Sequence, residues 1–217
     1  MIRSVIQTVA QTAWRVSSLG TTKGAHIVRY QMYKEIQRDL CGHSLGERVL
    51  SISHSSRLCG LLNVHPEHVV EANYPEQNIC RLSYPDGTFS AVVSDQVFEH
   101  IASNPGFAVD EVYRILAPGG IAVHTTCFLT PYHGSPDYQN ADNGDYWRFT
   151  PSGLALLHSK YSRIIAARGW GNTLMPVING LGLTRMPVPE ASWHPINRMA
   201  RLNRASYHYV VWVIAQK

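Results

Sequence analysis

Short apolar runs separated by helical patterns make up the middle of the chain. Two of these runs, at 91–93 and 121–123, are rich in β-branched side chains and flanked by turn residues, which is typical of buried parallel strands. Apolar residues recur at helical spacing between the two runs, and a Pro-Gly-Gly turn at 118–120 predicts the end of that helix. The pattern therefore predicts a strand-helix-strand crossover, which is right-handed almost without exception.

The alternation continues on both sides of this unit. A helix is predicted at 28–41 from its apolar spacing, and another at 153–161, where Thr150 is a good N-cap and Pro151 suits the first turn. Further strands are predicted at 48–52, 69–71 and 210–215. Strands and helices in this order indicate an open α/β sheet.

Ligands of open α/β sheets bind beyond the carboxyl ends of the strands, where the strand order reverses. Polar side chains that leave the predicted strands are therefore informative. Ser94, Asp95 and Gln96 follow the first strand of the central unit, and His124 ends the apolar run of the second.

Composition narrows the class of protein. A chain of 217 residues and 24.3 kDa is large enough for one domain with a full core. The net charge of +4 comes without a Lys/Arg block, so no nucleic-acid partner is expected. The four cysteines show no CxxC pairing, which is typical of reduced thiols and predicts a cytoplasmic protein.

The first 20 residues are amphipathic and basic, but they lack the compact apolar run and cleavage site of a signal peptide. No apolar stretch approaches the ~20 residues needed to cross a bilayer. We expect this segment to form a helix that packs on the domain, and contact with a membrane surface is the less favoured alternative.

Two segments carry a resemblance to a known family. PDGTFSAVVSDQVFEHI at 85–101, followed by EVYRILAPGG at 111–120, resembles the second half of class I S-adenosylmethionine-dependent methyltransferases of type 11. The loop after the first strand resembles that of a branch with serine in this loop. DYWRFTP at 145–151 resembles a segment of methyltransferases linked with sugar or cell-surface modification.

The resemblance implies an α/β, Rossmann-like fold. Its sheet would have seven mostly parallel strands with an antiparallel last strand, and helices on both faces. The whole chain, 1–217, would be a single methyltransferase domain, with an N-terminal helical cap at 1–45. The α/β core at 46–217 would contain an inserted loop at about 128–150.

The resemblance also implies S-adenosylmethionine as the cofactor. Glu71 lies roughly 20 residues after the first strand, where nucleoside-binding folds place an acid on the ribose hydroxyls. Serines at negative φ could present backbone N–H groups in the first loop, where the family has glycines. The expected cofactor-binding residues are Ser51, Ser53, His54, Ser55, Glu71, Ala72, Asn78, Ile79, Ser94, Asp95 and Gln96.

Methyl transfer to an oxygen acceptor needs positioning and a base, for which histidine is the usual residue. His133 and His124 are the candidate catalytic residues, and His100 is expected to pack or orient. We expect a small polar, possibly sugar-like acceptor, and no metal. The expected acceptor-binding residues are Arg29, Tyr30, Tyr33, Tyr146, Trp147 and Arg148.

Three alternatives remain open. His133, Asp137, Asp142 and Asp145 could hold Mg²⁺ or a similar ion that acidifies an acceptor hydroxyl. The altered glycine loop also fits a non-catalytic S-adenosylmethionine-binding module or pseudoenzyme. A dinucleotide oxidoreductase is less favoured, because no G-x-G-x-x-G follows the first strand.

Overall fold

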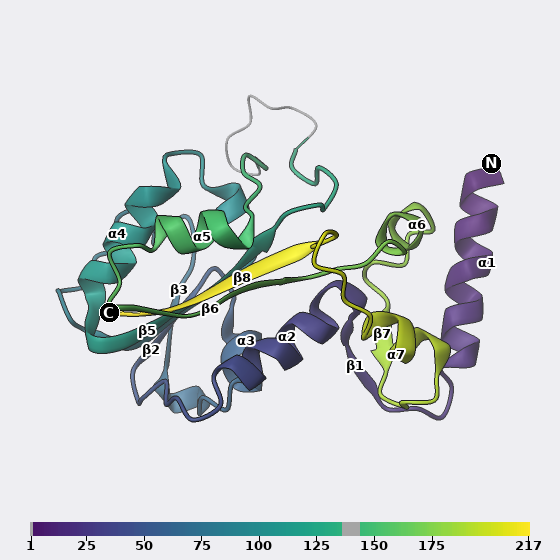
Figure 1. Ribbon diagram of the computed structural model, residues 1–217, viewed down its shortest axis with the longest axis horizontal. Helices are drawn as coiled ribbons and strands as arrows, with labels where there is room; N and C mark the ends of the chain where they lie inside the picture. Colours follow the sequence, from purple (N-terminus) through teal and green to yellow (C-terminus); the bar gives the residue numbers. More distant parts are fainter. Residues whose placement is uncertain (1, 136–143) are drawn as a thin grey trace. The chain divides into compact units, whose positions relative to one another are not determined.

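A computed structural model describes residues 2–135 and 144–217 of the chain (Figure 1). The chain forms two compact units, one of residues 36–169 with 210–217 and the other of residues 1–35 with 170–209. We call them the sheet unit and the terminal unit and describe each by itself. The expectation of a single domain stays a prediction.

A mixed sheet of six strands forms the centre of the sheet unit, in the order β3-β2-β4-β5-β8-β6. The first four are parallel, and β8 runs antiparallel to β5, which confirms the expected antiparallel last strand. Seven strands were expected in this sheet, and that count is not confirmed. The strands are β2 Val49–Ile52, β3 Val69–Ala72, β4 Phe89–Asp95, β5 Leu116–Cys127, β6 Arg163–Trp170 and β8 Val210–Gln216.

Helices cover both faces of this sheet, as expected, with α4 and α5 on one face and α3 on the other (Figure 1). An apolar cluster that includes Val92 of β4, Val112 of α4, Leu154 of α5 and Val213 of β8 fills the first interface. The helices of this unit are α3 Ser56–Leu61, α4 Pro105–Ile115 and α5 Pro151–Leu157, with short 3₁₀ helices η1 Pro66–His68 and η2 Phe98–His100.

The starts of two helices follow from their sequence. The side chain of Asn104 accepts a hydrogen bond from Gly106 N at α4, and Thr150 accepts one from Gly153 N at α5. A proline follows each cap at the first helical position, where its missing N–H costs nothing. The predicted N-cap at Thr150 is confirmed, although α5 ends four residues before the expected end.

The terminal unit contains the start of the chain and the segment before β8. Its elements are α1 Ile2–Ser17, β1 Lys23–His26, α6 Met175–Gly180, β7 Pro187–Pro189 and α7 Pro195–Ala200, and β1 pairs antiparallel with β7. Helix α2, Ile27–Asp39, begins in this unit and ends in the sheet unit. No helix in the described residues is long and apolar enough to cross a membrane.

Two histidines are buried together inside the sheet unit. The rings of His124 on β5 and His158 after α5 are 5.4 Å apart, and both are fully buried. Nδ1 of His124 bonds to Ser94 Oγ at 2.7 Å, and Nδ1 of His158 donates to the carbonyl of Leu154 at 2.8 Å. Burial lowers the pKa of His124 well below its ordinary value and that of His158 to about 4.

This pair makes the fold sensitive to mild acid. The unfolded chain protonates each histidine near pH 6.5, whereas the folded chain protonates His158 only near pH 4, so stability falls as the pH drops between these values. His158→Gln should make the fall in unfolding free energy shallower by about 1.4 kcal/mol per pH unit. Urea unfolding at pH 7, 6 and 5 measures this slope. The matched control His65→Gln, at an exposed site, should keep the wild-type slope, and parallel curves for wild type and His158→Gln would contradict the prediction.

Candidate functional site

A cavity of about 390 Å³ opens at the carboxyl ends of the parallel strands. Ser53 follows β2, Gln96 follows β4, and the segment after β3 closes the cavity with Asn78 and Ile79. These four are among the predicted cofactor-binding residues. The other lining residues are Tyr74, Gln77, Cys80, Val97, His100, Ile101, Ala102 and Ser103.

The turn after β2 has two residues in a backbone conformation that usually requires glycine. Ser53 and His54 lie in the left-handed region, with φ of 50° and 62°. Residues with a β-carbon rarely adopt this conformation. The expectation that the serines of this loop have negative φ is therefore wrong for Ser53, although the residue lines the cavity. Two backbone N–H groups hold the turn: Ser53 N donates to the carbonyl of Ala72 at 3.0 Å, and His54 N donates to the side-chain Oδ1 of Asn73 at 2.8 Å.

A third left-handed residue lies at the end of β4. Gln96 has φ of 60°, and its backbone N–H donates to Thr125 Oγ1 at 3.0 Å. With its amide nitrogen turned toward Glu99, the side chain donates to Oε1 at 3.2 Å. Strained backbone of this kind concentrates at functional sites. Two of the three strained residues at these strand ends, Ser53 and Gln96, line the cavity.

Glu71 lies one residue before the end of β3, beside the turn after β2. Its side chain is exposed, and its Oε2 accepts a hydrogen bond from Ser51 Oγ at 3.1 Å across the paired strands. Ser51 itself is fully buried. The structure therefore gives Ser51 the place of a residue that orients Glu71, while a carboxylate oxygen of Glu71 stays open to solvent.

The remaining predicted cofactor residues of this edge hold the strands together. Ser55 Oγ donates to Ile52 O at 2.5 Å and accepts from Asp95 N at 2.8 Å, which ties the turn after β2 to the end of β4. Ser94 is buried against His124, and Ala72 is buried at the end of β3. Asp95 accepts from Thr125 Oγ1 at 2.7 Å.

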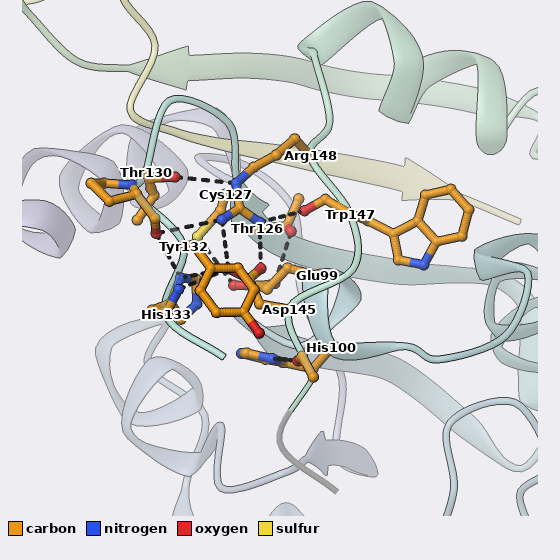
Figure 2. A network of polar contacts seen from close by, with 12 residues as sticks. Glu99, His100, Thr126, Cys127, Thr130, Tyr132, His133, Asp145, Trp147 and Arg148 are labelled. Carbon is orange, nitrogen blue, oxygen red and sulfur yellow. Dashed lines mark hydrogen bonds and ion pairs between the residues drawn. The ribbon is translucent and has the colours of Figure 1, made fainter. Parts of the chain in front are cut away.

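A polar network lies beyond the ends of β4 and β5 (Figure 2). Glu99 of η2 is completely buried, yet its carboxylate accepts from Thr126 Oγ1 at 2.8 Å and Cys127 Sγ at 3.3 Å. Its backbone carbonyl accepts from the N–H of Tyr146 at 2.7 Å and that of Trp147 at 3.3 Å. Glu99 thus joins η2 to the end of β5 and to the DYWRFTP segment.

His133 and Asp145 face one another in this network. Nδ1 of His133 lies 3.2 Å from Asp145 Oδ2, and the backbone N–H of His133 donates to the same oxygen at 2.9 Å. Arg148 pairs with both carboxylate oxygens, through Nη2 to Oδ2 at 2.6 Å and through Nη1 to Oδ1. Burial would raise the pKa of Asp145, but the bonds from Arg148 and His133 lower it below its ordinary value. Asp145 is therefore an ionised partner for the His133 ring.

The two candidate bases differ in access. The His133 side chain is 37% exposed, and its ring lies 5.2 Å from that of His100 in the cavity wall. His124 has no exposed surface and packs against Phe98 and His158. A base must reach the proton that it removes. The geometry therefore favours His133 over His124, which this structure places in the core.

The predicted acceptor-binding residues fall into both units. Tyr146 and Trp147 are exposed by 41% and 38%, and Trp147 Nε1 donates to Ile101 O at 2.7 Å. The guanidinium of Arg148 pairs with both carboxylate oxygens of Asp145. Arg29, Tyr30 and Tyr33 lie on α2 in the terminal unit, where Tyr30 donates to Glu190 Oε2 at 2.8 Å.

Three side chains in the network could hold a metal ion. Ligand atoms of Glu99, Cys127 and His133 all lie within 4.8 Å of one another. Burial and the charge of Glu99 raise the pKa of Cys127, which disfavours the thiolate that a metal would bind. Of the acids considered from the sequence, Asp145 pairs with Arg148, and Asp137 and Asp142 lie outside the described residues.

Sequence reasoning missed Glu99 and Cys127 as members of this site. Glu99 precedes His100 in the EHI segment that carried the family resemblance, so a signal for it was present. Its burial was not predictable, because an isolated glutamate is usually exposed. Cys127 carried no pattern, since its partners are far away in the sequence.

Comparison with known proteins agrees with this architecture. Residues 35–124 match a family described as a methyltransferase domain. No curated protein matches the chain. A putative sarcosine dimethylglycine methyltransferase from Galdieria sulphuraria has a similar fold, with a TM-score of 0.51 at 12% identity over 86% of this chain and 85% of that one.

A second solved structure, Haemonchus contortus phosphoethanolamine N-methyltransferase 2 in complex with S-adenosyl-L-methionine, also has a TM-score of 0.51. Its identity is 14%, and the match covers 87% of this chain and 52% of that one. The chain therefore spans about half the length of the Haemonchus enzyme. At these identities the likeness concerns the fold.

The strained turn predicts an unusual response to glycine. A left-handed residue with a β-carbon costs about 1–2 kcal/mol, and glycine loses part of that gain through its more flexible unfolded state. Ser53→Gly and His54→Gly should each raise the free energy of unfolding by about 0.5–1 kcal/mol. Urea unfolding checks this, with Ser53→Ala as a control that keeps the β-carbon and gains nothing. A glycine variant less stable than wild type would contradict the assignment of strain.

Proposed function

We propose that the protein is a class I S-adenosylmethionine-dependent methyltransferase that methylates an oxygen of a small polar or sugar-like acceptor, in line with the match of residues 35–124 to a methyltransferase domain. The observation that carries the proposal is the position of His133, an accessible histidine paired with the buried carboxylate of Asp145, next to His100 in the cavity wall. Methyl transfer to oxygen needs a group that accepts the hydroxyl proton, and His133 is in the position for this role.

The residues around the cavity suit a nucleoside with an amino-acid tail. Asn78 with Ile79 offers a polar and an apolar contact for a base. Glu71 is not among the residues that line the cavity, but near the end of the neighbouring β3 it offers a carboxylate oxygen for a ribose diol. The left-handed backbone at Ser53 and His54 keeps the course of a glycine loop. When bound, S-adenosylmethionine supplies an already activated methyl group, so this chain need only position the acceptor and remove its proton.

The contacts of His133 favour the tautomer that a base needs. Its Nδ1 lies within hydrogen-bonding distance of Asp145 Oδ2 and of the carbonyl of Pro131 at 3.1 Å, both of which accept. A proton on Nδ1 leaves Nε2 with a free lone pair. The ionised Asp145 holds the ring in this orientation. Arg148 in turn holds Asp145.

The acceptor would lie against the exposed aromatic residues of the DYWRFTP segment. Tyr146 and Trp147 provide apolar faces, and Trp147 is fixed through Ile101. Contact of Arg29, Tyr30 and Tyr33 with the acceptor stays a prediction. The four free cysteines support a cytoplasmic location.

Two competing accounts have weaker support. A pseudoenzyme with a decayed loop has less reason to keep left-handed φ angles at two residues that resist them. A metal-assisted methyltransferase would need the Cys127 thiolate, which burial and Glu99 disfavour, or a different ligand set.

The cofactor assignment is tested at Glu71. Glu71→Ala should weaken S-adenosylhomocysteine binding by roughly 10- to 150-fold, because bonds to a charged group contribute about 1.5–3 kcal/mol. Isothermal titration measures this. Glu67→Ala removes a nearby exposed acid on η1 and should bind as wild type does. Equal dissociation constants for wild type and Glu71→Ala would remove Glu71 from the site.

The catalytic assignment is tested at His133. A screen of hydroxylated sugars and small acids with labelled methyl donor identifies an acceptor. With that acceptor, His133→Ala should lower turnover about 10²–10⁴-fold while cofactor affinity stays nearly unchanged. His65→Ala is the control and should turn over normally.

Adding a chelator to the turnover assay distinguishes catalysis by a histidine base from catalysis assisted by a metal ion. EDTA should leave wild-type turnover unchanged. Loss of turnover that a divalent ion restores would favour a metal held by Glu99, Cys127 and His133. Wild-type turnover in both His133→Ala and His124→Ala would leave positioning alone as the better account.

A further inference from the structure

Helix α1 turns a row of valines toward solvent and two glutamines toward its own unit, which is unusual for a helix that packs on a domain. The face that contacts the rest of the terminal unit holds two glutamines beside the buried Trp14: Gln7 donates to Gly180 O at 3.1 Å and Gln11 to Gly182 O at 3.3 Å. Trp14 completes this face through a bond to Pro187 O at 2.8 Å. Spacings of four and three residues place the three side chains on one side of the helix.

The opposite face is apolar and open to solvent. Val5, Val9 and Val16 are 57%, 63% and 60% exposed, and spacings of four and seven residues place them in one stripe. Ile6 flanks the stripe and Leu19 follows the helix, both at least half exposed. The expected helix therefore packs on its unit through Gln7, Gln11 and Trp14, and this packing leaves the valine stripe exposed.

Positive charge is concentrated in the terminal unit, which also contains α1. The terminal unit has nine Lys and Arg residues against two acidic ones, whereas the sheet unit has ten against thirteen. No aspartate or glutamate occurs before Glu35, and Arg15 and Lys23 on and after α1 are exposed. Among the described residues, the terminal unit, about a third of the chain, also carries ten of seventeen exposed large apolar side chains.

We infer that α1 binds an anionic lipid surface, with the Val5-Val9-Val16 stripe in the boundary between headgroups and acyl chains. An apolar stripe beside exposed cationic residues, here Arg15 and Lys23, is the combination that interfacial helices use. Each lysine or arginine near an anionic leaflet contributes about 1 kcal/mol. At 16 residues, α1 is about 24 Å long, too short to span the ~30 Å hydrocarbon core, so it lies on the surface.

Two other partners of α1, a second copy of the chain and a nucleic acid, fit the helix less well. Pairing of α1 with the same helix of a second copy would bring cationic residues together without acidic partners, which opposes association. A nucleic acid would use the cationic residues but leaves the valine stripe without a role. The inference is independent of the methyl-transfer chemistry.

Cosedimentation of the full chain with vesicles tests the inference. Binding to phosphatidylcholine vesicles with an equal part of phosphatidylglycerol should exceed binding to pure phosphatidylcholine, and should fall as salt rises. Val9→Asp should weaken the partition about tenfold or more, and Arg15→Glu with Lys23→Glu should weaken it without touching the stripe. Leu156→Asp is the matched control, since Leu156 is 75% exposed on α5 of the sheet unit, and it should bind as wild type.

Several results would overturn the inference. Absence of binding to either vesicle, or equal loss in Val9→Asp and Leu156→Asp, excludes a role for the stripe. A dimer in light scattering that Val9→Asp dissociates, without vesicle binding, assigns the stripe to a second copy. Binding to a short oligonucleotide that Val9→Asp leaves intact, again without vesicle binding, assigns the charge to nucleic acid.

Discussion

Backbone hydrogen bonds across three parallel strands align Ile52 with Ser94 and Ser94 with His124. Because the strands run in the same direction, whatever follows each of these residues emerges at one edge of the sheet. The left-handed turn after β2, the left-handed Gln96 after β4 and the network beyond β5 are neighbours for this reason. A slip of one residue in β4 would turn its side chains to the other face and separate these groups.

The strands themselves could be predicted from the sequence, whereas their register and the conformations at their ends could not. Runs such as 91–93 and 121–123 are short, β-branched and flanked by turn signals, so the strand-helix-strand unit followed directly. Thr150 and Pro151 carried their own local signal for a helix start, and they form one. Nothing local indicates that Ser53, His54 and Gln96 take positive φ, because their neighbours in space, such as Ala72 and Thr125, impose it.

The burial of polar side chains could not be predicted from the sequence either. His124 was predicted to be reactive because it leaves a strand at the expected edge, yet Ser94 and the ring of His158 enclose it. Glu99 was treated as part of a family signature, and Thr126 and Cys127 make its burial tolerable. Amphipathicity revealed that α1 has two faces, but the choice of the inward face depended on carbonyls of residues 180, 182 and 187.

The short helix η2 couples the cavity to the aromatic DYWRFTP segment. Residues in and beside it, Val97, His100 and Ile101, form part of the cavity wall, while Glu99 O and Ile101 O hold the backbone and indole of Trp147. One turn of chain is thus shared by the wall of the cavity and the support of the aromatic segment. Any ligand that moves η2 alters both places, and thermodynamic reciprocity requires the two occupancies to change each other's free energy equally. Two sites that share one wall cannot be filled independently unless that wall stays still.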